Sequence, residues 1–248
     1  MIGFTNAAPF RLIAPGFPVA MLSGDPSDLT ARMSAGELDA CLLPTGAFER
    51  LGDRVKPLGP YGIACCGHVM SLRLFSKVPV HDLMQPERTV YVTPRTTTTR
   101  ELLRELFRRE FGAVPKITED ATIADASLLI GDEAMDFSRP EYRWPVARDI
   151  SEWWFSQTGL GFIFAQWVVT AAASEESVAV LTEWVEENLA FAATSEGRER
   201  LREAGAAVGW SPAITELYFE RLEFRLAQKH TQGLAEFHRV LKGINHGD

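Results

Sequence analysis

The 248-residue chain is poor in side chains that bind metals tightly. Its three cysteines, Cys41, Cys65 and Cys66, are odd in number and have no Cys-x-x-Cys spacing. Its five histidines form no His-Glu-x-x-His motif or other ligand cluster. The sequence therefore predicts no metal site and no disulfide framework, and it favours reduced, buried thiols.

Positive charge and long apolar runs are scarce too. With 25 Lys and Arg against 33 Asp and Glu, the net charge is −8, and no basic cluster is present that would neutralise a phosphate backbone. The longest apolar stretch, residues 160–173, is interrupted by Gln166 and Thr170 and is shorter than the roughly 18 residues of a membrane span. We expect no secretory leader, because Ile2 follows Met1 directly. We expect a soluble cytoplasmic protein with no nucleic-acid or membrane partner; the oligomeric state stays open.

Short apolar runs alternate with amphipathic segments over the first two thirds of the chain. The first strand is expected to begin at Ile2 and to end near Asn6, because Pro9 has no backbone N–H. A loop is expected around the glycines and proline of residues 59–62. Alternation of this kind predicts an α/β fold with mixed, mainly parallel sheets.

The tail beyond Ser174 differs, since it predicts only helices, over 174–192, 195–204, 211–229 and 231–241. Two strand-like crossings, 69–75 and 162–170, bracket the middle of the chain. We therefore expect two lobes, one formed by residues 1–72 and 168–248 and the other by 73–167. A ligand cleft is expected between them, because domain interfaces are preferred sites for small molecules.

Four polar segments are candidates for the site. They are Asn6, residues 67–71, the threonine run 96–99, and the pair formed by 131–132 and 158–161. Thr98 and Glu101 have capping-box spacing, so a helix should start here, and its N-terminus could hold an anion. Each segment also has a plain structural interpretation as a turn or a helix cap. No one of them is specific alone.

Taken in order, these segments resemble the chorismate dehydratase family of the futalosine pathway of menaquinone biosynthesis. The resemblance covers residues 2 to about 170. It rests on the following stretches: Gly3-Phe4-Thr5-Asn6-Ala7-Ala8-Pro9, Gly36 to Ala40 with Pro44, Gly67 to Ser71, Leu74-Phe75-Ser76, Leu129 to Met135, Thr158-Gly159-Leu160, and Phe164 to Trp167. The chain departs from the family pattern in having threonines at 96–99, Gly161 in place of a proline, and Cys66 in place of a basic residue.

The resemblance implies a two-lobed fold of the type II periplasmic-binding-protein kind with a helical C-terminal tail. It implies conversion of chorismate to 3-[(1-carboxyvinyl)oxy]benzoate with loss of water, an aromatisation that needs no cofactor or metal. Asn6 would hydrogen-bond near the reacting centre, and Asp132 would be a general base or orient a donor. The substrate-binding residues would be Ser71, Thr98, Thr99, Thr158 and Gly159. A carboxylate of the substrate itself could also be the base.

Two other functions stay open. The sister enzyme that makes 1,4-dihydroxy-6-naphthoate opens with a Ser-Pro-Cys-Pro-Asn-Asp type of motif and uses a base histidine, whereas this chain has Thr5-Asn6-Ala7-Ala8-Pro9. A non-catalytic protein that senses an anion could use the same fold, because fold alone does not decide function.

Overall fold

The computed structural model describes residues 3–94, 98–139 and 144–245. The chain forms two units, unit 1 from Met1–Ala64 and Ile163–Gln228, and unit 2 from Cys65–Phe162 and Lys229–Asp248. The sequence analysis placed the boundaries at residues 72 and 167 and the whole tail in the first lobe. In the structure the chain changes unit after residues 64, 162 and 228, so the last helix belongs almost entirely to unit 2.

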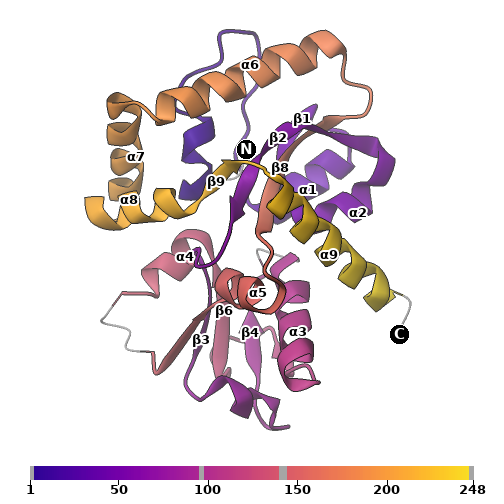
Figure 1. Ribbon diagram of the computed structural model, residues 1–248, viewed down its shortest axis with the longest axis vertical. Helices are drawn as coiled ribbons and strands as arrows, with labels where there is room; N and C mark the ends of the chain where they lie inside the picture. Colours follow the sequence, from indigo (N-terminus) through magenta and orange to yellow (C-terminus); the bar gives the residue numbers. More distant parts are fainter. Residues whose placement is uncertain (1–2, 95–97, 140–143, 246–248) are drawn as a thin grey trace. The chain divides into compact units, whose positions relative to one another are not determined.

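Unit 1 is built on a four-stranded sheet with the order β1-β8-β2-β9. Strand β1 runs antiparallel to β8, with Leu42 opposite Trp167. The rings of Phe10, Trp167 and Trp184 pack edge to face in the core of this unit. The elements of unit 1 are η1 (Thr5–Phe10), α1 (Pro26–Ser34), β1 (Ala40–Pro44), η2 (Thr45–Ala47), α2 (Phe48–Leu51), η3 (Gly52–Arg54), β2 (Val55–Cys65), β8 (Phe162–Thr170), α6 (Glu175–Ala192), α7 (Ser195–Ala207), α8 (Pro212–Arg221) and β9 (Glu223–Arg225) (Figure 1).

The opening segment is a 3₁₀ helix, η1, and the prediction of a strand ending near Asn6 is wrong. The N–H of Ala7 donates to the carbonyl of Phe4 at 3.1 Å, which closes a helical turn. Consecutive residues of η1 are buried, without the alternation of a half-exposed strand. A short apolar run can form either a buried strand or a buried helical turn, so the periodicity of its residues could not distinguish these two conformations.

The expected loop at residues 59–62 is part of the eleven-residue strand β2. Gly62 explains how a strand tolerates this composition, because a Cβ there would lie 2.5 Å from the carbonyl oxygen of Ala165 on β8. The glycine lets the two backbones approach closely. Pro60 keeps a useful acceptor, since its carbonyl takes a 2.7 Å hydrogen bond from the N–H of Leu226.

The predicted helices of the tail form, with one interruption. Ser174, Thr194 and Ser211 cap α6, α7 and α8 by accepting a hydrogen bond from a backbone N–H three residues on. The expected helix 211–229 ends at Arg221, and strand β9 follows, which corrects the prediction of a tail without strands. Leu222 and Leu226 are both buried, and four-residue spacing suits a strand face as well as a helix face.

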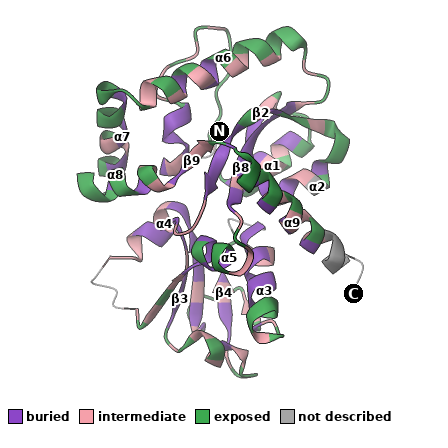
Figure 2. Ribbon diagram, viewed as in Figure 1, coloured by how far each residue is buried: buried purple, intermediate pink, exposed green. Residues whose placement is uncertain are grey.

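Unit 2 is built on a five-stranded sheet with the order β5-β4-β6-β3-β7. Its strands β3, β4 and β6 are mostly buried (Figure 2). The elements of unit 2 are β3 (Leu72–Ser76), η4 (Val80–Met84), β4 (Val90–Val92), α3 (Thr98–Phe111), β5 (Ile117–Thr118), β6 (Ala126–Ile130), α4 (Gly131–Asp136), β7 (Val146–Asp149), α5 (Ile150–Thr158) and α9 (Gln228–Asn245).

Both parallel and antiparallel pairs occur, which confirms a mixed α/β architecture. Strand β4 is parallel to β5 and β6, as a strand–helix–strand alternation predicts. Strand β3 is antiparallel to both β6 and β7, and the pairs β1–β8 and β2–β9 are antiparallel as well. The expectation of mainly parallel pairing is therefore corrected, because alternation along the chain does not fix the direction of a strand that enters from the other unit.

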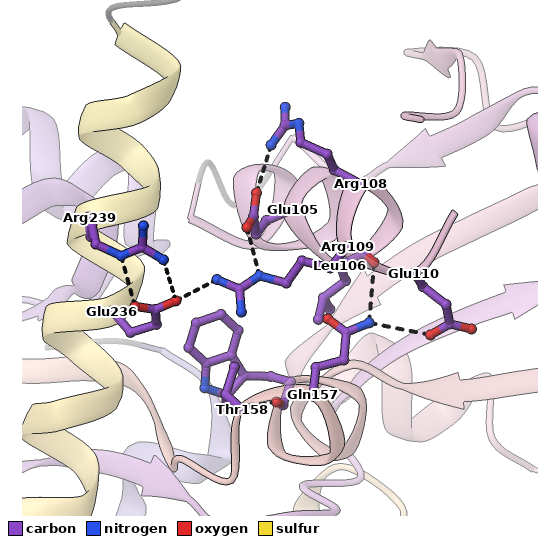
Figure 3. A network of polar contacts seen from close by, with 10 residues as sticks. Glu105, Leu106, Arg108, Arg109, Glu110, Gln157, Thr158, Glu236 and Arg239 are labelled. Carbon is purple, nitrogen blue, oxygen red and sulfur yellow. Dashed lines mark hydrogen bonds and ion pairs between the residues drawn. The ribbon is translucent and has the colours of Figure 1, made fainter. Parts of the chain in front are cut away.

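Helix α9 is fastened to the rest of unit 2 by rings and by ion pairs. Phe237 packs against Trp154 and Phe162, with ring centroids 6.4 and 5.2 Å away. One turn of α9 also carries Glu236, whose carboxylate accepts hydrogen bonds from Arg109 at 2.6 Å and from Arg239 at 2.8 Å (Figure 3). The helix is thus part of the unit 2 core and not an appended tail.

Candidate functional site

Three of the predicted segments meet at one edge of the sheet of unit 2. Because β4 and β6 are parallel, their carboxyl ends lie at the same edge, and the segments that follow lead into α3 and α4. Antiparallel β3 begins at that edge, with Leu72 opposite Ile130. Open α/β sheets bind ligands outside the carboxyl ends of their strands, so this edge is the candidate site of unit 2.

Ser71 and Asp132 flank the junction of β3 and β6. The N–H of Gly131 donates to the carbonyl of Ser71 at 2.8 Å, which places the two segments side by side. Ser71 is buried, whereas Asp132, in the first turn of α4, is half-buried. The structure therefore brings together two predicted segments that are far apart in the sequence, the one that contains Ser71 and the one that contains Asp132.

Thr98 and Thr99 are the first two residues of α3 and both are buried. They lie in the first turn of a fourteen-residue helix, where the positive end of the helix dipole favours a negative charge. The helix begins where it was predicted. Thr96 and Thr97 lie outside the described residues.

Asp149, which the sequence analysis did not name as a site residue, holds the segment in front of Ser71. Its buried carboxylate accepts hydrogen bonds at Oδ2 from the N–H groups of Val69, at 3.1 Å, and Met70, at 2.7 Å. At Oδ1 it accepts two more, each 3.1 Å long, from the N–H groups of Ser151 and Glu152, and so caps α5. One side chain thus joins a helix to the site.

The backbone that Asp149 holds is conformationally unusual. Met70 has a φ of +72°, the one positive value among the described residues other than glycine. This conformation is costly for a side chain with a Cβ and persists where the surroundings impose it. His68 Nε2 lies 3.6 Å from Asp149 Oδ2, which adds a third contact to the same segment. The position of Ser71 therefore depends on Asp149.

Burial raises the pKa of Asp149, and His68 together with the backbone N–H groups acts in the opposite direction. An aspartate directly before an apolar helical segment is a recognisable helix cap. Its bonds to residues 80 positions earlier leave no trace in the sequence, because they arise only when β7 pairs with β3.

Thr158 and Gly159 lie at the opposite end of α5 from Asp149, about 13 Å along a nine-residue helix. The Thr158 hydroxyl donates to the carbonyl of Trp154 at 2.8 Å and accepts from the N–H of Leu160 at 3.1 Å. Gly159 ends the helix with a φ of +67°, which favours glycine. These contacts terminate α5, and the part of both residues in substrate binding stays a prediction.

Asn6 belongs to unit 1 and is half-buried within η1. Its side-chain oxygen, Oδ1, is shielded from solvent and accepts no hydrogen bond from any described residue. A buried acceptor without a donor costs about 1–3 kcal/mol, so this oxygen would gain from a hydrogen-bond donor on a ligand. Asn6 therefore stays a candidate although its predicted strand does not form.

The fold is one that binding proteins share. The protein AF1704 from Archaeoglobus fulgidus superposes with a TM-score of 0.76 at 15% identity, over 99% of this chain and 96% of that one. The Candida albicans CA3427 gene product, described as having the generic periplasmic binding protein fold, superposes with a TM-score of 0.63 at 9% identity, over 98% and 92%. The predicted periplasmic-binding-protein-like fold is confirmed.

The sequence places the chain more narrowly. The chain belongs to the menaquinone biosynthesis family, whose model matches residues 1–242. A chorismate dehydratase from Thermus thermophilus is 26% identical in an alignment of 264 positions, gaps included. The alignment covers 96% of this chain and 92% of that protein. The family resemblance is thereby confirmed. Within the described residues, no helix is both long and apolar enough to cross a membrane.

Proposed function

We propose that this protein is a chorismate dehydratase, which removes water from chorismate and yields 3-[(1-carboxyvinyl)oxy]benzoate. The family and the Thermus thermophilus relative support the activity. Among the observations on the site, the buried oxygen of Asn6 carries the proposal furthest, because it offers an acceptor to a hydroxyl group of the ligand. The hydroxyl that leaves chorismate is such a donor.

The reaction removes the proton from the carbon that bears the enolpyruvyl ether and expels hydroxide from the neighbouring carbon. Aromatisation of the ring drives it, so the protein has to orient the substrate and stabilise its charges. We assign Asn6 to the departing hydroxyl. Ser71, Thr98 and Thr99 are assigned to the substrate carboxylates, supported by the start of α3.

Asp132 is assigned to the proton transfer, either as the base or as the residue that orients a donor. Its half-buried position next to Gly131, whose N–H donates to the carbonyl of Ser71, supports this role. Asp149 is a positioning residue, because it acts through the backbone of Val69 and Met70 and not on the substrate. A substrate carboxylate is the alternative base, and turnover by Asp132→Asn would favour it.

The first test is incubation of the purified protein with chorismate, followed by mass spectrometry for a product that has lost one water. Asn6→Ala is expected to abolish turnover while the thermal unfolding midpoint is preserved. Asn6→Asp keeps the size of the side chain and replaces the amide by a carboxylate, so it is expected to be inactive as well. Unchanged chorismate in the wild-type sample would contradict the proposal. Calorimetry would then separate a binding protein from one that does not recognise chorismate.

The second test compares two serines that bracket β3. Ser71→Ala is expected to raise KM about tenfold, the loss of roughly one charge-assisted hydrogen bond. Ser76→Ala is the matched control, because the buried Ser76 hydroxyl donates to the carbonyl of Val78 at the far end of the strand. It is expected to lower stability and leave KM unchanged. Equal KM values for the two variants would remove Ser71 from the site.

A further inference from the structure

Cys66 and His230 form a thiol–imidazole pair inside unit 2 that takes no part in the proposed reaction. The Sγ atom of Cys66 lies 3.5 Å from Nε2 of His230. His230, near the start of α9, has no exposed surface, whereas Cys66, directly after β2, is half-buried. A buried base beside a partly exposed thiol is the arrangement that activates cysteine nucleophiles.

Glycine residues make room for this pair. A Cβ at Gly161 would lie 2.6 Å from Cδ2 of His230 and 2.7 Å from Sγ of Cys66. A Cβ at Gly233 would in turn overlap the carbonyl oxygen of Gly161, so α9 lies against the backbone in front of β8. Cys66 and Gly161, two of the places where the sequence departs from the family pattern, therefore lie next to each other and next to the same histidine.

The other two cysteines provide a contrast within the same molecule. Cys41 and Cys65 are buried, and burial raises the pKa of Cys41 to about 11. The Cys41 thiol donates to the carbonyl of Leu42, and the Cys65 thiol donates to that of Gly67. The expectation that all three thiols are buried is thus corrected for Cys66.

We propose that Cys66, with His230 as its base, is a covalent modification site for small uncharged electrophiles. In the reaction, the thiol proton moves to His230 Nε2 and the sulfur attacks the electrophilic carbon. With iodoacetamide, the S–C bond forms as the C–I bond breaks, iodide leaves, and no oxidant or reductant is needed. This inference does not depend on the proposed dehydratase activity, because it concerns other residues and another chemistry.

The test is alkylation of the full chain with iodoacetamide at pH 7, followed by digestion and mass spectrometry with fragmentation to separate Cys65 from Cys66. Cys66 is expected to react about tenfold faster than N-acetylcysteine, because an ordinary thiol is only a few per cent thiolate at this pH. Cys41 and Cys65 are expected to stay unmodified. His230→Gln, which keeps a polar side chain and loses the base, is expected to bring Cys66 to or below the rate of N-acetylcysteine.

Cys41 serves as the internal control for folding, since an unfolded variant would expose it to alkylation. A wild-type Cys66 that reacts no faster than N-acetylcysteine would overturn the proposal without any variant. So would a His230→Gln protein with Cys41 still protected and the wild-type rate at Cys66. Chorismate turnover is not read in this experiment, so its result and that of the dehydratase test are independent.

Discussion

Two segments of unit 2 are each held by one carboxylate, and they are held in opposite ways. Asp149 is buried and binds the backbone of residues 69 and 70, whereas Glu236 lies near the surface and binds the guanidinium groups of Arg109 and Arg239. Burial raises the pKa of Asp149, and the arginine hydrogen bonds lower that of Glu236 to about 2. The buried carboxylate of Asp149 therefore costs free energy to desolvate, and its removal should be strongly destabilising. The carboxylate of Glu236 costs little to desolvate, and its replacement should change stability only slightly.

The largest effect is expected from Asp149→Ala. The change leaves four backbone N–H groups without their acceptor, which outweighs the relief of the costly conformation at Met70, so the free energy of unfolding should fall by about 3–5 kcal/mol. Urea unfolding measures it, and turnover with chorismate should fall too. Asp120→Ala is the control, because Asp120 is exposed and bonds within its own loop. Equal free energies of unfolding for Asp149→Ala and Asp120→Ala would contradict the role given to Asp149.

A smaller loss is expected from Gly233→Ala in α9. In an exposed helix this change is favourable by up to about 1 kcal/mol, but here the new Cβ would overlap the carbonyl of Gly161. We expect a loss of about 1–3 kcal/mol in thermal or urea unfolding. The reverse change at the exposed Ala235, Ala235→Gly, should cost about 1 kcal/mol through helix propensity alone. A stabilised Gly233→Ala protein would show that the backbone of Gly161 does not lie this close to α9.

Glu236→Gln should cost about 1 kcal/mol at neutral pH and low salt. The sign of its pH dependence follows from the lowered pKa of Glu236. Its contribution is complete above about 4.5, the ordinary value, and is lost as the pH falls toward about 2. Urea unfolding at a series of pH values should therefore show the wild-type and variant curves converging in acid. A difference that stays constant from pH 6 to pH 3 would contradict this role.

The smallest effect is expected within the same group of ion pairs. Arg239 is 72% exposed and bonds to a glutamate one turn away on its own helix, whereas Arg109 is 25% exposed and joins α3 to α9. Arg109→Gln should therefore lower stability measurably, and Arg239→Gln should leave the urea midpoint unchanged. Equal losses would mean that both pairs act through general charge and not through the link between helices.

The sequence predicts well the elements whose signals are local. Strand β8 has the predicted bounds, Phe162–Thr170, and α6 and α7 begin within one residue of their predicted starts at 174 and 195. Prediction from the sequence fails where contacts with a backbone segment distant in the sequence determine the conformation. Strand β9 forms because β2 offers it an edge, and β2 tolerates glycine and proline because β8 approaches it closely.

The site follows the same rule. Ser71, Asp132 and the threonines of α3 could be named from family motifs, and sheet topology then explains why they meet at one edge. Asp149 could not be named for this role, because its two bonds to residues 69 and 70 span about 80 positions of sequence. Motifs identify the groups that we propose touch the substrate, and the groups that hold them in place emerge only from the folded chain.

Helix α9 lies at the end of the sequence but belongs to unit 2, and this sets the order in which the two units are completed during synthesis. Residues 65–162 leave the ribosome long before Phe237, the ring that packs on Trp154 and Phe162. The apolar face around these two side chains therefore stays uncovered while all the later segments of unit 1 are being made. The sequence of unit 1 is complete at residue 228, whereas that of unit 2 also needs the residues from 229 onward.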